Sequence, residues 1–156
     1  MPIVTTTYEL AAPADAVWRL LEDFGAIDRW WPTDGPAPIE HVVVEGSGVG
    51  MIRHIRNRGM PHAVSERLDF IEASSRTWML SIVGDRPLGL TGYVAEGQLQ
   101  ELAPDRCRID YRAHFSVAAD REDSVRKALL KSWTLMFQGL ERAANATVAA
   151  NPGHRQ

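Results

Sequence analysis

The chain has 156 residues, of which 45% are hydrophobic and 24% are charged, a balance typical of a folded domain rather than a disordered or fibrous chain. A formal net charge of −3 excludes the broad basic surface of a general nucleic-acid-binding protein. The single cysteine, Cys107, excludes an internal disulfide and a multi-cysteine metal cluster. Because no basic leader and no run of about 18 apolar residues is present, we expect a cytoplasmic protein without membrane insertion.

The first quarter of the chain predicts one strand and two short helical segments. Residues 3–10 alternate between two faces in the manner of a strand. Residues 13–24 carry apolar side chains at helical spacing, and a second helical piece over 26–31 ends before Pro32. A loop rich in proline and glycine then extends to residue 38.

From residue 39 the pattern changes to short β-type runs separated by turn signals. The predicted strands are 39–45, 49–57, 62–72, 76–83, 91–102 and 106–115. Their short connections favour antiparallel neighbours. A long helix over 120–148 follows, with Asp120 as its candidate N-cap. We expect a single ligand-binding domain over residues 1–150 and a flexible tail over 151–156.

These elements predict an α+β fold with a cavity. A wide antiparallel sheet of seven strands curls, and one long amphipathic helix can cover its concave face. The inner side of that helix carries the small residues Ala128, Ser132 and Gly139, next to Met136. Small side chains there would leave space between helix and sheet, as a small-molecule site requires.

Several motifs in the same order carry a family resemblance. They are Ala12 to Trp18, Arg29-Trp30-Trp31-Pro32, Gly48 to Arg53, Ser65 to Asp69, Gly92-Tyr93 and the C-terminal helix. The chain thereby resembles the START-like, birch-pollen-allergen-like SRPBCC superfamily, which includes polyketide cyclases and the plant abscisic-acid receptors. The resemblance implies a helix-grip fold, a curved seven-stranded antiparallel sheet around a long helix, with a small hydrophobic ligand between them.

Strand parity predicts which side chains face the cavity, because alternate residues point to opposite sides of a sheet. It places Val64, Leu68 and Phe70 inside on one strand, with Glu66 on the same face. Ligand-facing positions on the other strands are Arg53, Ile55, Trp78, Leu80, Ile82, Tyr93, Tyr111 and Ala113.

Arg53 and Glu66 are the polar centre of this prediction, since they fall on the inner face of adjacent strands. Neither charge would be buried unpaired, because desolvation costs several kcal/mol per ion. One interpretation is a structural ion pair that closes one end of the cavity. The other is a polar floor for a ligand head group, with hydroxyls from Tyr93 and Tyr111. The resemblance favours the second, since the matching positions of Glu66 and Tyr93 in the hormone receptors contact ligand, partly through water.

Further candidates lie at the cavity mouth. Arg29 is either solvent-facing or, as the resemblance to the hormone receptors implies, a partner for a ligand carboxylate. Trp31 is a core anchor or a lining residue. The loops 58–62 and 84–90 combine glycine and proline with an apolar residue, which fits either ordinary hairpin turns or covers over the cavity.

Three kinds of function remain open. The first is binding of a lipid-like or polyketide-like molecule. The second is a cyclase, aromatase or dehydratase, in which Arg53 would stabilise an enolate oxygen and Glu66 or Tyr93 would move protons. The third is an interaction module, in which the terminal strand 3–10 would support a homodimer. The five histidines show no ligand spacing, so we expect no metal and no cofactor.

Overall fold

The structure is a computed structural model in which residues 1–150 are described. The seven strands are β1 (Ile3–Leu10), β2 (Ile39–Glu45), β3 (Ile52–Asn57), β4 (Val64–Glu72), β5 (Thr77–Val83), β6 (Gly92–Ala103) and β7 (Arg106–Ser116). The helices are α1 (Ala14–Glu22), α2 (Glu122–Ala150) and the 3₁₀ segments η1 (Phe24–Arg29), η2 (Pro87–Gly89) and η3 (Ala119–Arg121). The predicted tail over 151–156 lies outside the described residues.

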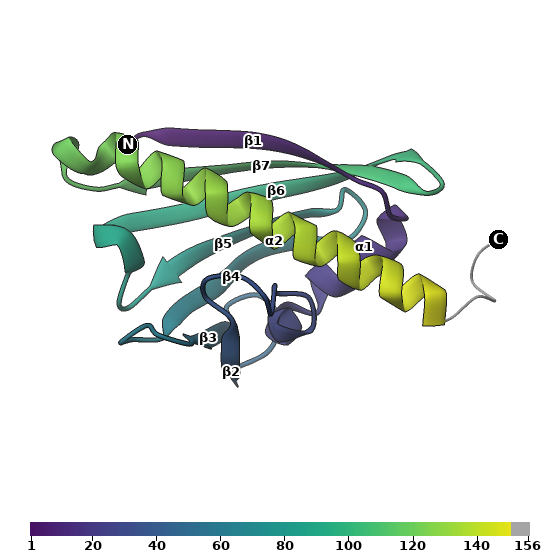
Figure 1. The fold of residues 1–156 in the computed structure, drawn as a ribbon, viewed down its shortest axis with the longest axis horizontal. Coiled ribbons are helices and arrows are strands. Elements are labelled where there is room, and N and C mark those ends of the chain that lie inside the picture. Colours follow the sequence, from purple (N-terminus) through teal and green to yellow (C-terminus); the bar gives the residue numbers. More distant parts are fainter. Residues whose placement is uncertain (151–156) are drawn as a thin grey trace.

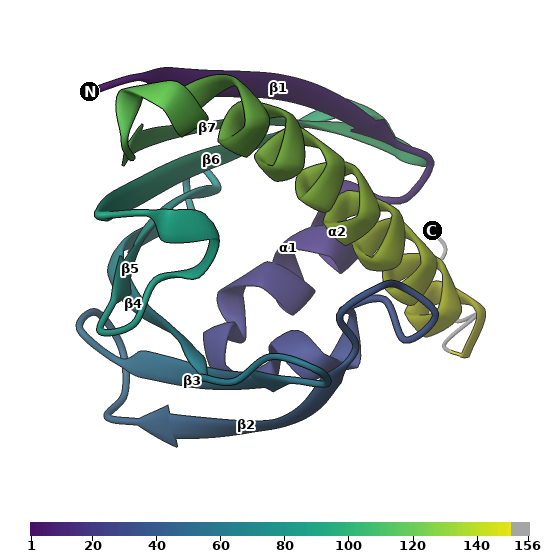
Figure 2. The same cartoon turned by 60° about the vertical axis from the view of Figure 1, so that its left-hand side comes forward.

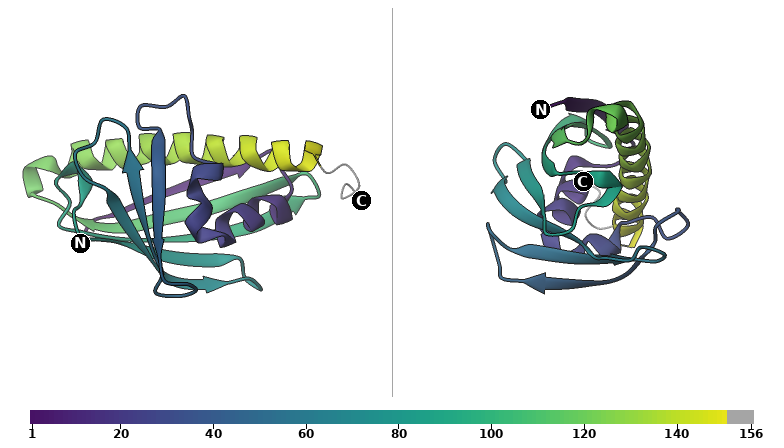
Figure 3. Two further views of the ribbon diagram at one scale, coloured as in Figure 1. Left: turned by 90° about the horizontal axis from the view of Figure 1, so that it is seen from below. Right: turned by 90° about the vertical axis from the view of Figure 1, so that its left-hand side faces the viewer.

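All the strands form one antiparallel sheet in the order β1-β7-β6-β5-β4-β3-β2. Helix α2 crosses the concave side of this sheet, and α1 with η1 fills the end between α2 and the β2–β3 hairpin (Figures 1 and 2). The two views in Figure 3 show the sheet bending around the helix. The helix-grip fold expected from the sequence is therefore confirmed. β1 is an edge strand, as the homodimer expectation requires, and dimerisation itself stays a prediction.

The core lies between the sheet and α2, and it follows strand parity closely. The inner positions of β6 and β7 are buried in strict alternation, from Tyr93 to Leu99 and from Cys107 to Phe115. Cys107 pairs with Leu10 across β1 and β7 and is fully buried. Burial raises the pKa of its thiol to about 11, more than the neighbouring Arg76 lowers it.

Parity is wrong at Phe70, whose side chain is 41% exposed rather than inside. The pairing of β4 with β5 shifts between Leu68 and Phe70. A β-bulge there leaves Asp69 without a residue opposite it in the backbone register of β5. The Asp69 carboxylate there accepts hydrogen bonds from Ser81 and Arg67. One extra residue reverses the two faces, so Ile71 packs against the core in place of Phe70.

Two expectations about α2 are also wrong. Asp120 does not cap it, because η3 occupies Ala119–Arg121 and the helix begins at Glu122. Gly139 does not open the cavity. A Cβ at Gly139 would lie 2.5 Å from the carbonyl oxygen of Trp30, so this glycine allows the segment after η1 to pack directly on α2.

Candidate functional site

A cavity of about 280 Å³ lies between the sheet, α2 and two loops. Small-molecule pockets span roughly 300–1,000 Å³, so this space suits a compact ligand. Most of the predicted ligand-binding residues line it: Trp31, Arg53, Ile55, Glu66, Leu80, Ile82, Tyr93, Tyr111, Ala128, Ser132 and Met136. Sheet parity and the inner row of α2 thus bring these side chains together.

The other predicted residues lie outside this lining. Ala113 is completely buried in the core, and Trp78 lines a separate space of about 20 Å³. The Arg29 side chain is 59% exposed and contacts Asp23 at 3.6 Å. The structure therefore gives Arg29 the solvent-facing position, away from the cavity wall.

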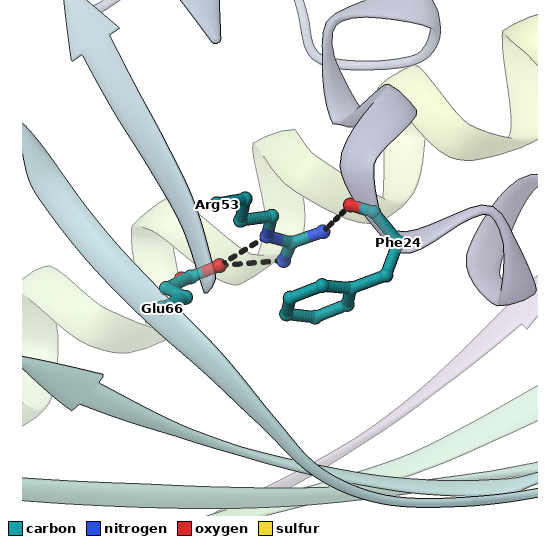
Figure 4. Close-up of polar contacts among 3 residues, drawn as sticks. All are labelled: Phe24, Arg53 and Glu66. Carbon is teal, nitrogen blue, oxygen red and sulfur yellow. Dashed lines mark hydrogen bonds and ion pairs between the residues drawn. The ribbon is translucent and has the colours of Figure 1, made fainter. Parts of the chain in front are cut away.

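Arg53 and Glu66 form the polar wall of the cavity (Figure 4). They are directly paired residues of β3 and β4, and their side chains are only 7% and 17% exposed. Arg53 Nε donates to Glu66 Oε2 at 2.7 Å, and Arg53 Nη2 lies 2.5 Å from the same oxygen. The predicted ion pair is present, and both contacts from Arg53 reach a single carboxylate oxygen.

Phe24 of η1 holds the arginine from the other side (Figure 4). Arg53 Nη1 donates to the Phe24 carbonyl oxygen at 2.8 Å, and the guanidinium carbon lies 3.8 Å from the centre of the Phe24 ring. Two hydrogen bonds, an ion-pair contact and a cation–π contact therefore fix the guanidinium in one orientation.

Tyr93 and Tyr111 continue the polar wall beneath α2. Burial, reinforced by Glu66, raises the pKa of Tyr93, while hydrogen bonds with Trp133 and Tyr111 lower it by less. Burial also raises the pKa of Tyr111, whose ring meets Trp133 edge-on with centroids 4.7 Å apart. Both phenols are therefore neutral near pH 7 and can donate hydrogen bonds.

These raised pKa values predict a loss of stability in alkali. Above about pH 10 the unfolded chain releases the phenolic protons of Tyr93 and Tyr111 while the folded chain keeps them. Their contribution is therefore complete below pH 10 and declines as the pH rises beyond it. We expect a spectrophotometric titration to show these phenolates appearing together with the loss of near-ultraviolet circular dichroism. Ionisation of all tyrosines in the folded protein would contradict this result.

The cavity mouth is organised around the carbonyl oxygen of Ala37. Trp31 Nε1 donates to it at 2.9 Å and Asn57 Nδ2 donates at 2.8 Å. Both donors line the cavity, so the loop before β2 is tied to its rim. Asn57 was not among the predicted residues, although it continues the odd-numbered inner positions of β3.

Both loops considered as covers contribute to the lining. Met60 comes from the loop between β3 and β4, and Pro87, Leu88 and Leu90 come from the loop between β5 and β6. The apolar residues of these loops thus face the cavity, as the cover interpretation requires. Val64, which parity placed inside, also lines the cavity. The lining residues beyond the predicted ligand-binding set are completed by Ile27, Ala37, Leu129 and Trp133.

Comparison with protein families shows the family of the chain. The profile of the family described as polyketide cyclase / dehydrase and lipid transport matches residues 1–150. The protein belongs to this family. The match confirms the SRPBCC resemblance stated from the motifs. Comparison with the curated proteins gives no match.

Solved structures confirm the fold of this polyketide cyclase/dehydrase family member. An uncharacterised protein from Bacillus thuringiensis aligns with a TM-score of 0.77 at 20% identity, covering 92% of this chain and 98% of that one. A protein from Thermobifida fusca gives 0.77 at 23% identity, with 93% and 95% covered. Norcoclaurine synthase from Thalictrum flavum gives 0.71 at 20% identity, with 90% and 84% covered. At these identities the similarity establishes the helix-grip architecture.

None of the helices in residues 1–150 combines the length and apolarity needed to cross a lipid bilayer. Within the same residues, no three histidine, cysteine, aspartate or glutamate side chains gather closely enough to hold a metal ion.

Proposed function

We propose that the protein binds a small hydrophobic or amphipathic molecule, lipid-like or polyketide-like, between the sheet and α2. The observation that carries this proposal is the asymmetry of the cavity. Its walls are mostly aliphatic and aromatic, and the charged side chains are confined to Arg53 and Glu66 at one side. An apolar body would lie against Leu90 and Leu129, while a polar end meets the ion pair.

A cyclase-type or dehydratase-type enzyme is the alternative, and it uses the same cavity. Norcoclaurine synthase, which shares the fold, has been solved in complex with dopamine and hydroxybenzaldehyde. The local chemistry here favours binding. Tyr93 and Tyr111 have raised pKa values, which suits hydrogen-bond donation better than proton abstraction near pH 7. Arg53 is already committed to Glu66 and Phe24.

A cavity-filling substitution tests the proposal. Ser132 lines the cavity from α2, so the ring in Ser132→Phe would occupy the space of the ligand. Using 2-naphthol as the probe in isothermal titration calorimetry, we expect the affinity to fall at least about tenfold, equivalent to about 1.4 kcal/mol. Native mass spectrometry of the purified wild-type protein would identify any molecule that remains bound.

The matched control is Thr134→Phe, two residues along the same helix. Thr134 is exposed and is absent from the cavity lining. We expect this variant to bind 2-naphthol like the wild type and to keep its melting temperature. Equal binding by both phenylalanine variants would place the probe elsewhere and refute the cavity as the binding site.

A further inference from the structure

The cavity wall is electrically balanced. Arg53 and Glu66 are the charged residues of its lining and have opposite signs, so the lining has a formal charge of zero. Arg29 and Arg121 are not among the lining residues. Arg29 is turned to solvent beside Asp23, and Arg121 lies against Gly89 on the loop before β6. A buried ligand therefore meets no unpaired protein charge in the lining.

The Nε–Nη2 edge of Arg53, one of the two forks it could offer a ligand carboxylate, is also already occupied. Its Nε and Nη2 contact Glu66, its Nη1 bonds to the Phe24 carbonyl, and its face is covered by the Phe24 ring. A bidentate arginine–carboxylate contact needs two parallel N–H groups on one edge. The edge formed by Nε and Nη2 already carries Glu66.

What remains on the polar wall is a set of groups suited to a hydroxyl. Both contacts from Arg53 end on Oε2 of Glu66, so Oε1 keeps its full capacity to accept a hydrogen bond. Tyr93, Tyr111 and Ser132, each of which carries a hydroxyl, line the same cavity. A neutral O–H can donate to Oε1 and accept from a tyrosine without introducing a net charge.

We infer that the Arg53–Glu66 pair makes the cavity selective for an uncharged, hydroxyl-bearing ligand over a carboxylate or ammonium of the same shape. This inference rests on the proposed binding function and narrows its ligand class. A charged ligand would lose its hydration on entering the cavity and find no free counter-charge there. The carboxylate role considered for Arg29 has no place in such a site, because Arg29 does not line it.

The experiment compares probes that share one bicyclic skeleton. Binding of 2-naphthol, 2-naphthoate and 2-naphthylmethylammonium to the wild-type protein is measured by isothermal titration calorimetry at about pH 7. We expect 2-naphthol to bind at least about tenfold more tightly than either ion. If 2-naphthoate or the ammonium binds as tightly as 2-naphthol, the charge selectivity is refuted and the binding function stands. If none of the three binds, both proposals are overturned.

A charge-changing variant provides a second, independent readout. Glu66→Gln keeps a carbonyl acceptor for Arg53 and leaves the cavity with one net positive charge. We expect the affinity ratio of 2-naphthoate to 2-naphthol to rise at least about tenfold in this variant. An unchanged ratio in a folded variant would contradict the inference. Should the variant fail to fold by circular dichroism, the wild-type comparison decides alone. The matched control is Glu101→Gln, which removes an exposed carboxylate on β6 and should leave the ratio unchanged.

Discussion

Replacing Arg53 with methionine is expected to destabilise the protein by about 3–5 kcal/mol, because the carboxylate of Glu66 would remain largely buried without its partner. For a chain of this size, that loss corresponds to a fall of roughly 6–20 °C in the melting temperature, measurable by differential scanning calorimetry. The variant would also lose the hydrogen bond to the Phe24 carbonyl and the contact with its ring.

The double variant Arg53→Met with Glu66→Leu distinguishes the cost of an unpaired buried charge from the cost of lost side-chain packing. Replacing both partners by apolar residues of similar size removes the unpaired charge, so we expect most of the lost stability to return. Arg112→Met serves as the control. Arg112 contacts Glu96 at 3.2 Å on the solvent side of the sheet, where an ion pair contributes about 0–1 kcal/mol. If Arg53→Met lowers the free energy of unfolding no more than Arg112→Met does, the buried ion pair contributes no more to stability than an exposed one.

Gly97→Ala should cost about 3 kcal/mol, although glycine is usually unfavourable within a strand. A Cβ at Gly97 would lie 2.3 Å from Cζ2 of Trp78, whose indole ring crosses the strand at this point. Trp78 is buried among Trp18 and Tyr111, so its ring has little room to move. Thermal unfolding of the variant measures the effect.

Gly35→Ala is the matched control for this prediction. A Cβ there would meet Pro32 at 3.6 Å, an ordinary van der Waals distance. The substitution should be neutral or should stabilise by about 0.4–1 kcal/mol, because it restricts the unfolded chain. If the two alanine variants melt at the same temperature, the close contact between Gly97 and Trp78 is not limiting.

The sequence predicts the fold well because each element leaves a periodic signal. Alternation along β6 and β7 fixes their inner faces, and short turns fix their antiparallel pairing. The face of Phe70 could not be predicted in this way. The bulge at Asp69 depends on how β4 meets β5, and a hydrophobic pattern alone does not show where one strand gains an extra residue.

The candidate site is predictable only in part for a related reason. Parity places Arg53, Glu66 and Trp78 on the inner face, and all are found there. Parity does not tell which stretch of the inner face stays open and which is filled. Trp78 lies outside the main cavity because it packs against Trp18 of α1, a contact between segments far apart in the chain. The orientation of Arg29 depends on η1 and its neighbour Asp23, which periodicity does not describe.

The single cysteine, Cys107, provides a built-in probe of local opening of the fold. It is fully buried on β7, beside Leu10 of β1, and its raised pKa keeps it protonated at neutral pH. Alkylating reagents attack the thiolate, so they modify it in molecules where the packing around Cys107 has opened. The rate of labelling therefore reports how often this part of the core opens, without any engineered tag. A ligand that binds only the native state would lower the rate of Cys107 labelling, and tighter binding would lower it further.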